Sequence, residues 1–165
     1  MKPITNDIKN KILMYNKNGL DISPLIEDVE LKGVDLSNSI INKLYRIDAN
    51  LQGAKFAGCS LGEPESTSIT FVRCNLDDVS FKGAKFVGNA WLRSCSAKRV
   101  DLRYCDWSKV DYKYSDFRGA NFCESILKFG AQSGLGCKFS KDIFYSLSKV
   151  WDMKVTVEDR EEGTV

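Results

Sequence analysis

Large apolar residues recur at every fifth position of this chain, first as Leu31, Leu36 and Ile41. A helix places residues on one face about every 3.6 positions and a strand about every 2, so neither element produces this spacing. A compact residue stands two positions before each large one, and the position between them is usually polar. A fixed period kept over many copies indicates a repeat protein, in which each unit buries its apolar side only by stacking on its neighbours.

The clearest copies of the unit share a small, polar, large order followed by two variable residues. They are Val34–Asn38, Ala49–Gly53, Val110–Tyr114 and Ala120–Glu124. This pattern resembles the pentapeptide-repeat family, whose consensus is Ala, then Asp or Asn, then Leu or Phe, and two free positions. The match runs from Ile26 to Phe144. The resemblance implies an all-β solenoid, a right-handed quadrilateral (square) β-helix of about six coils with short helical caps at one or both ends.

The repeat divides its inward residues into large and small positions. The large positions are Leu31, Leu36, Ile41, Leu51, Phe56, Leu61, Phe71, Leu76, Phe81, Phe86, Leu92, Leu102, Trp107, Tyr112, Phe117, Phe122, Leu127 and Phe139. The small positions are Val34, Ala49, Ala54, Cys59, Cys74, Ala84, Cys95, Val100, Cys105, Val110, Ala120 and Cys137. We expect all of them to face the centre of the column.

Both ends of the chain depart from the repeat. We expect an N-terminal helical cap at 1–24, the repeat β-helix at 25–145, and a C-terminal cap with a flexible acidic tail at 146–165. Thr5 or Asn6 is a good N-cap for a helix over 7–17, and Gly19 is a good stop. Apolar residues at helical spacing between Ser140 and Met153 predict a second helix. The resemblance to the family allows a homodimer through this C-terminal segment.

The amino-acid composition argues against several classes of function. The chain of 165 residues has 24 Lys and Arg against 22 Asp and Glu, a net charge of +2, and no histidine. Without histidine there is no Ser-His or Cys-His nucleophile, so we expect no enzyme and no cofactor. No apolar run approaches the roughly 20 residues of a membrane span, and the start lacks the apolar run of a signal peptide. We therefore expect a cytoplasmic protein without membrane association.

Five of the six cysteines occupy the compact inward position: Cys59, Cys74, Cys95, Cys105 and Cys137. Free cysteine packs as a small hydrophobe, so we expect these to be core thiols in place of alanine. Cys123 falls on an outward position. A metal site is not expected, because the chain lacks Cys-x-x-Cys spacing as well as histidine.

Four aspartates, Asp101, Asp106, Asp111 and Asp116, each precede a large inward residue. Aspartate commonly bonds to the backbone of a turn, so we expect a structural role at the corners rather than catalysis. With four repeats per coil, these aspartates fall on four different faces. Some pentapeptide-repeat proteins resemble double-stranded DNA in shape and charge and bind DNA gyrase or topoisomerase IV. The dispersed aspartates and the positive net charge disfavour that function here.

Nucleic-acid binding is the opposite alternative. Lys82 and Arg103 are expected to share one face, and Arg93 and Lys113 the next. These pairs form a mildly basic corner, and the pI near 8.2 is below that of a strongly basic domain. We therefore expect a protein partner and no nucleic acid.

Interruptions of the repeat predict the partner-binding surface. A twenty-residue coil puts Arg46 and Ser66 at inward positions of one face, and because a buried arginine is costly we expect a bulge that turns Arg46 outward. The loop 62–68, an insertion at 87–89 and the Gly-rich stretch 130–136 follow the same face. The candidate seam consists of Tyr45, Arg46, Glu63, Glu65, Asn89 and Trp91. The alternative is that irregular copies drifted there under weak constraint.

The leading functional hypothesis is therefore a non-enzymatic, rigid protein-binding scaffold from a bacterium or its phage. Two alternatives remain. One is a DNA mimic that binds gyrase or topoisomerase and gives quinolone resistance, and the other is a secreted bacterial effector or its targeting module.

Overall fold

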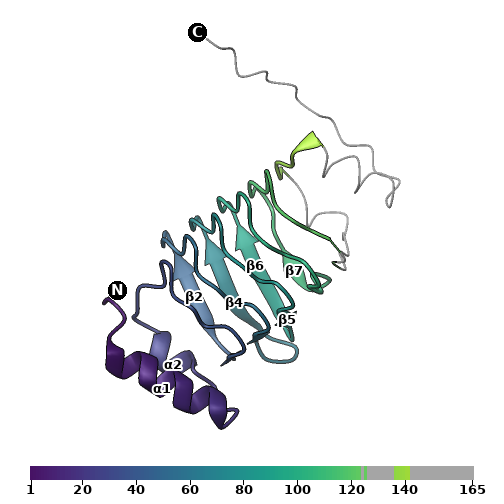
Figure 1. The fold of residues 1–165 in the computed structure, drawn as a ribbon. Coiled ribbons are helices and arrows are strands. Elements are labelled where there is room, and N and C mark those ends of the chain that lie inside the picture. The colour runs from purple at the N-terminus through teal and green to yellow at the C-terminus, as the bar shows by residue number, and fades with distance from the viewer. Residues whose placement is uncertain (124, 126–135, 142–165) are drawn as a thin grey trace.

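The computed structural model describes residues 1–123, 125 and 136–141. Its helices are α1 (Asn6–Lys17) and α2 (Ser23–Ile26). Its strands are β1 (Ile40–Ile41), β2 (Leu44–Ile47), β3 (Ser60–Leu61), β4 (Thr67–Val72), β5 (Lys85–Phe86), β6 (Asn89–Arg93) and β7 (Val110–Asp111). They form two parallel sheets, of order β1-β3-β5 and β2-β4-β6-β7. Both helices lie at the N-terminal end of the column (Figure 1).

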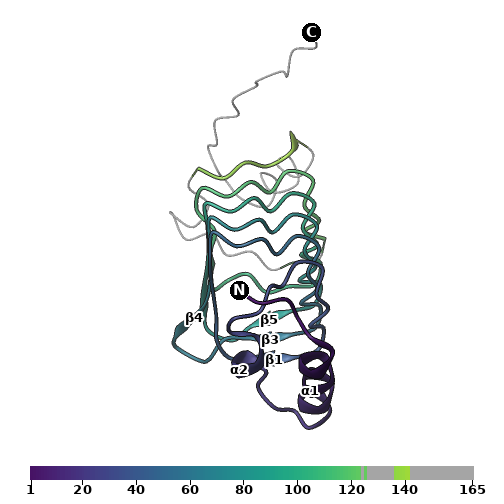
Figure 2. The ribbon, with the colours of Figure 1, turned by 90° about the vertical axis from the view of Figure 1, so that its left-hand side faces the viewer.

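Two further lines of parallel bridges join the coils outside the named strands. One runs through Asp35, Lys55, Ser80, Asp101 and Asn121, and the other through Asn50, Asn75, Ser96, Asp116 and Lys138. Together with the two sheets, they give a parallel β-solenoid whose coils stack along the column (Figure 2). Four lines of pairing are consistent with a square cross-section. The expected six coils are not confirmed within the described residues.

Many of the five-residue units turn a corner of the coil through a tight turn. The carbonyl of Leu31 accepts a hydrogen bond from the backbone N–H of Val34 at 3.1 Å, and Leu36 and Ser39 repeat this contact at 3.2 Å. The third residue of both these turns has a positive φ, 67° at Gly33 and 61° at Asn38. Glycine adopts this conformation without steric cost, and asparagine tolerates it. The variable end of the repeat is therefore where the chain turns.

The large repeat residues fill the column. All the large positions named from the sequence are buried except Phe122 and Phe139, which are partly buried, and Leu127, which lies outside the described residues. Phe56 stacks on Phe81 with ring centroids 5.2 Å apart, and Trp107 meets Phe86 edge-on at 5.6 Å. Such contacts add to the burial of apolar area.

The compact positions line the inner corners. All those named from the sequence are buried except Cys137, which is half-buried. The six cysteines are free thiols. The thiol of Cys59 donates to the carbonyl of Leu36 at 3.0 Å, and the hydroxyl of Ser115 donates to that of Leu92 at 2.6 Å. A thiol or hydroxyl here thus satisfies a carbonyl of the preceding coil.

The four aspartates perform the expected corner role. Asp101 Oδ1 accepts a hydrogen bond from the backbone N–H of Arg103 at 3.2 Å, two residues ahead. The equivalent contacts are Asp106 to Ser108 at 2.9 Å, Asp111 to Lys113 at 3.3 Å and Asp116 to Arg118 at 3.1 Å. The aspartates lie on four different lines of pairing, which confirms their dispersal over the faces.

At the N-terminus, α1 begins at the expected cap, because Thr5 Oγ1 accepts a hydrogen bond from the N–H of Ile8 at 3.3 Å. Ile12 is buried against the core. The three-part division of the chain stays a prediction. The tail at 146–165 lies outside the described residues, as do nearly all of the helix expected over 140–153 and of the Gly-rich stretch 130–136.

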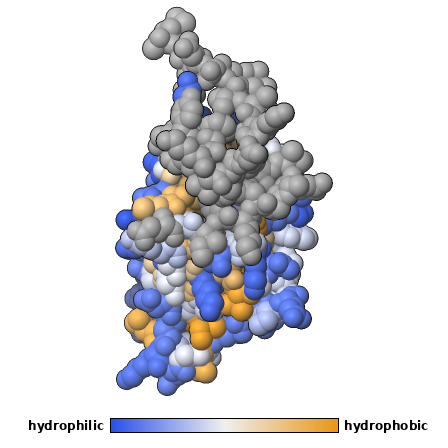
Figure 3. Space-filling model, turned by 90° about the vertical axis from the view of Figure 1, so that its right-hand side faces the viewer, coloured by the Kyte–Doolittle hydropathy of each residue, from blue (hydrophilic) through white to orange (hydrophobic). Residues whose placement is uncertain are grey.

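The outer surface is mixed. In Figure 3, hydrophobic surface gathers in patches between hydrophilic side chains. None of the helices in the described part of the chain is long and apolar enough to cross a membrane.

Candidate functional site

The pairing of β2 with β4 corrects the predicted register of the seam. Arg46 pairs with Phe71, and not with Ser66 as a strict twenty-residue coil requires. The reason is that the chain between β3 and β4 leaves the column as a loop, so five extra residues separate the paired positions. Ser66 lies in this loop and is half-exposed, so its expected inward position is wrong.

Arg46 itself is buried, so the expected outward bulge is also wrong. Its Nη1 donates to the carbonyl of Tyr45 at 2.7 Å. Its Nη2 donates to the carbonyl of Ile26, at the end of α2, and to that of Val29 at 3.4 Å. These backbone oxygens take the place of a carboxylate partner. Burial lowers the pKa of Arg46, and its Nε has no hydrogen-bond partner.

The outer face of the four-stranded sheet carries a row of residues in register. Tyr45 pairs with Thr70, Thr70 with Trp91, and Trp91 with Asp111. Tyr45 is 50% exposed and Trp91 38%, whereas Thr70 between them is buried. The Tyr45 hydroxyl donates to the carbonyl of Thr67 at 3.0 Å, which holds the ring against β4. Two exposed aromatic side chains therefore stand on the same face of the sheet, one on each side of Thr70.

Cationic groups accompany both aromatic rings. Lys43 Nζ lies 5.7 Å from the centroid of the Tyr45 ring, and the Arg93 guanidinium lies 4.1 Å from that of Trp91. Arg93 also forms an ion pair with Asp111. The contact of Trp91 with Arg93 is a cation–π interaction that fixes the indole on this face.

The loop between β3 and β4 packs back on the start of β6. The carbonyl of Ser66 accepts a hydrogen bond from the N–H of Asn89 at 2.8 Å, and the N–H of Glu63 donates to Ser68 Oγ at 3.1 Å. Glu63, Glu65 and Asn89 are exposed. Five of the six predicted seam residues thus reach the surface, and Arg46 does not.

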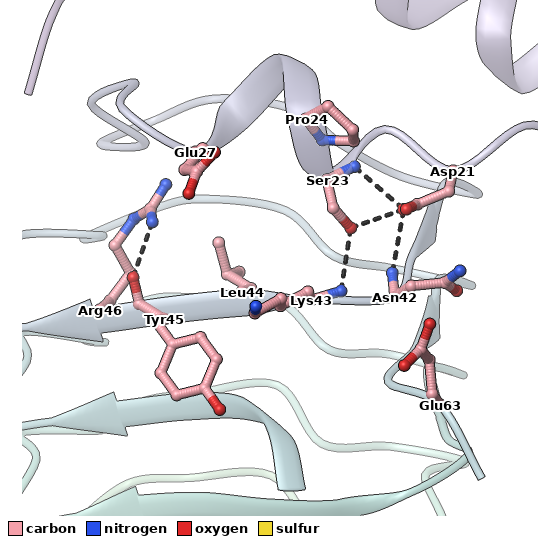
Figure 4. A pocket seen from close by; sticks show the side chains of 10 residues that line it. All are labelled: Asp21, Ser23, Pro24, Glu27, Asn42, Lys43, Leu44, Tyr45, Arg46 and Glu63. Atoms are coloured by element: carbon pink, nitrogen blue, oxygen red, sulfur yellow. Dashed lines mark hydrogen bonds between the residues drawn. The ribbon is translucent and has the colours of Figure 1, made fainter. Parts of the chain in front are cut away.

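A hollow of about 480 Å³ lies between α2 and β2 (Figure 4). Its lining includes three seam residues, Tyr45, Arg46 and Glu63. The others are Asp21, Ser23, Pro24, Glu27, Asn42, Lys43 and Leu44. Sequence reasoning missed these seven, although a polar residue directly before proline is typical of a helix start and could have indicated the turn at Ser23.

Asp21 accepts the hydrogen bonds that order the floor of the hollow. Its Oδ1 accepts hydrogen bonds from the N–H of Ser23 at 3.0 Å, from Ser23 Oγ at 2.5 Å and from the N–H of Asn42 at 3.0 Å. Ser23 Oγ in turn accepts from the N–H of Lys43 at 2.9 Å. This network ties α2 to the first coil, which makes the hollow part of a fixed surface. No group of three metal-binding side chains gathers anywhere in the described ranges.

No family model and no curated protein matches this sequence. Solved structures with a similar fold include QnrB1, a plasmid-mediated fluoroquinolone resistance protein. It is 16% identical, with a TM-score of 0.45 over 76% of this chain and 67% of that chain.

A second similar structure is HetL from the cyanobacterium Nostoc, a pentapeptide repeat protein involved in heterocyst differentiation regulation. It is 18% identical with a TM-score of 0.41, and the match covers 68% of this chain but only 52% of HetL. A third is a pentapeptide repeat protein from the thylakoid lumen of Arabidopsis thaliana, 18% identical with a TM-score of 0.30 over 73% of this chain and 75% of that one. These likenesses concern the fold alone.

The assignment of the repeat fold rests on the sequence and structure of this chain itself. The five-residue unit runs through the sequence, and its large and compact residues line the inside of a parallel solenoid. The chain thus has the five-residue repeat and the parallel solenoid fold that its resemblance to the pentapeptide-repeat family implies.

Proposed function

We propose that this protein is a non-enzymatic scaffold that binds a protein partner through one outer face. We call this surface the seam face: the outward residues of β2, β4 and β6 together with the loop 62–66. The observation that carries the proposal is the exposure of Tyr45 and Trp91 in register on either side of Thr70.

The composition of the seam face suits protein recognition. Tyrosine, tryptophan and arginine are the residues that most often dominate the binding energy of protein interfaces. Ile47, 58% exposed, extends the apolar area along β2, and Arg93 stands at its border. Glu63 and Asn89 add polar groups at the other edge, as in the rim of an interface.

The seam face is also preorganised. Its residues stand on paired strands, and its loop is hydrogen-bonded to β6. A surface that does not have to be ordered on binding loses less conformational entropy, which favours affinity.

The DNA-mimic alternative has less support. A mimic needs carboxylates aligned along the column, whereas the two bridged lines of outward residues outside the sheets have no adjacent pair of carboxylates among the described positions. Several aspartates are also matched by arginines, as Asp78 is by Arg99 at 2.7 Å. An assay of gyrase activity with added protein would test this alternative directly.

The proposal is tested with a double variant, Tyr45→Ala with Trp91→Ala. Its matched control is Tyr104→Ala with Tyr114→Ala, which removes two exposed aromatic rings, 52% and 58% exposed, from outside the seam face. Partners recovered from the native cells with the wild type are purified, and their affinities are measured by calorimetry. We expect the seam variant to weaken binding about 30-fold or more, the effect of losing about 2 kcal/mol at an interface. Equal affinity of the two double variants would overturn the proposal.

A further inference from the structure

Cys74 and Cys95 occupy the same inner corner of successive coils. The bridge between Asn75 and Ser96 places them directly opposite each other, and the N–H of Ser96 donates to the carbonyl of Cys74 at 3.0 Å. Both thiols are buried. Paired strands lie about 4.8 Å apart, which is within the range of about 4.4–6.8 Å between the Cα atoms of disulfide-bonded cysteines.

No other thiols of the described residues are adjacent in this way. Cys59 and Cys105 share the next inner corner, but Ala84 lies between them, because Ser60 pairs with Lys85 and Lys85 bridges Asp106. Ser115 lies between Cys95 and Cys137 in the same manner. The stacking of two thiols is therefore particular to Cys74 and Cys95.

The two thiols interact and differ in acidity. The interaction between the two side chains lowers the pKa of Cys74 and raises that of Cys95. The thiol of Cys74 also contacts the carbonyl of Arg46 at 3.3 Å, and that of Cys95 contacts the carbonyl of Phe71 at 3.4 Å. A thiolate with a neighbouring resolving cysteine is the arrangement of a redox-reactive pair.

We propose that Cys74 and Cys95 are an oxidation site that closes to a disulfide between two successive coils. Hydrogen peroxide is a sufficient oxidant. The Cys74 thiolate attacks one peroxide oxygen, an S–O bond forms as the O–O bond breaks, and hydroxide leaves. The Cys95 sulfur then attacks the Cys74 sulfur, the S–O bond breaks, and the Cys95 proton leaves with the oxygen as water. Two thiols and one peroxide give one disulfide and two waters, counting the proton that Cys74 lost.

The site is independent of the proposed docking function but lies near it. Cys74 follows the end of β4 at Val72, and Cys95 follows the end of β6 at Arg93. A bond between them ties together the two strands that carry Thr70 and Trp91. Oxidation would thereby brace the seam face against separation of its coils.

The experiment uses the full chain with Cys123→Ser, which removes the exposed thiol. Folded protein is treated with hydrogen peroxide, free thiols are alkylated after unfolding, and linked peptides are identified by mass spectrometry. In a second arm, reduced unfolded chain refolds in a mixture of reduced and oxidised glutathione, so that slow entry of peroxide into the core does not limit the outcome.

We expect a single linked species, Cys74 to Cys95, in both arms, with Cys59 and Cys105 still open to alkylation. Cys74→Ser or Cys95→Ser should abolish the link, and circular dichroism checks that both variants keep the fold. The proposal is overturned if neither arm gives this link, or if Cys59 and Cys105 are oxidised as readily as Cys74 and Cys95.

Discussion

The guanidinium of Arg46 donates a hydrogen bond to the carbonyl of Ile26, twenty residues earlier in the chain. Through this contact and a second to Val29, one side chain of β2 donates hydrogen bonds to backbone oxygens at and just after the end of α2, where carbonyls lack intrahelical partners. A charged residue inside the column therefore links the N-terminal helices to the first coil through hydrogen bonds.

Replacing Arg46 by methionine removes these donors while keeping most of the side-chain volume. We expect a loss of about 2–3 kcal/mol in the free energy of unfolding, since hydrogen bonds to charged groups are strong and three buried or partly buried carbonyls each lose a donor. Urea unfolding measures the loss. Arg73→Met is the control, because Arg73 forms an exposed ion pair with Asp48 and its removal should cost under about 1 kcal/mol.

Truncation of Trp107 should destabilise the fold much more than truncation of Trp91. Trp107 is fully buried and has edge-on contacts with Phe81, Phe86 and Phe117, so Trp107→Ala should cost about 3–5 kcal/mol of stability. Trp91→Ala should cost about 1 kcal/mol, mainly through the lost contact with Arg93. Chemical unfolding of the two variants checks the difference. Similar losses would mean that Trp91 is a core residue rather than a docking residue.

Low pH should reduce the stability that the Asp101 carboxylate contributes to the fold. The hydrogen bond from Arg103 lowers the pKa of this carboxyl below its ordinary value. A carboxyl with a depressed pKa in the folded state stabilises the fold above its unfolded pKa of about 3.9, and this contribution disappears as the pH falls through the lower folded value. Asp101→Asn should thus be less stable than the wild type at neutral pH, and the difference should shrink below about pH 4. Urea unfolding at several pH values tests this, and a constant difference would contradict it.

Glycine is required at position 88 because backbone atoms of the neighbouring loop approach it closely, and not because of an unusual backbone angle. A Cβ atom at this position would stand 2.0 Å from the carbonyl oxygen of Glu63 and 2.6 Å from that of Ser66. Gly88→Ala should displace the loop 62–66 and cost about 1–3 kcal/mol, as other overpacked sites do. Hydrogen exchange should show faster exchange at Asn89, whose N–H donates to Ser66. Unchanged protection of that amide would contradict the expected displacement.

The sequence predicted the repeat and its inward residues because a side chain that breaks the period leaves a gap in a stacked core. It also predicted the pairing of later coils: Lys82 lies beside Arg103, and Arg93 beside Lys113, in the observed registers. Those predictions allowed for the single inserted residue near Gly88, which shifts the phase and is therefore visible.

The sequence did not reveal the length of the loop between Leu61 and Phe71, because this loop leaves the phase of the repeat unchanged. It adds five residues to the coil, one whole unit, so the large residues on both sides keep the same phase. The burial of Arg46 was missed because its acceptors belong to α2, and no spacing within the repeat reveals a contact with the end of another element. The hollow between α2 and β2 escaped prediction because it too depends on how the N-terminal residues sit on the first coil.

The looped-out unit has a wider consequence for how such a column can diversify. Lengthening a coil by one complete repeat changes the outline of the molecule while every later residue keeps its inside or outside orientation. New surface can thus be acquired without redesign of the interior, and its position along the column is free to vary. An insertion of any other length has to be absorbed by a local distortion, such as the register shift between Thr67 and Ile69.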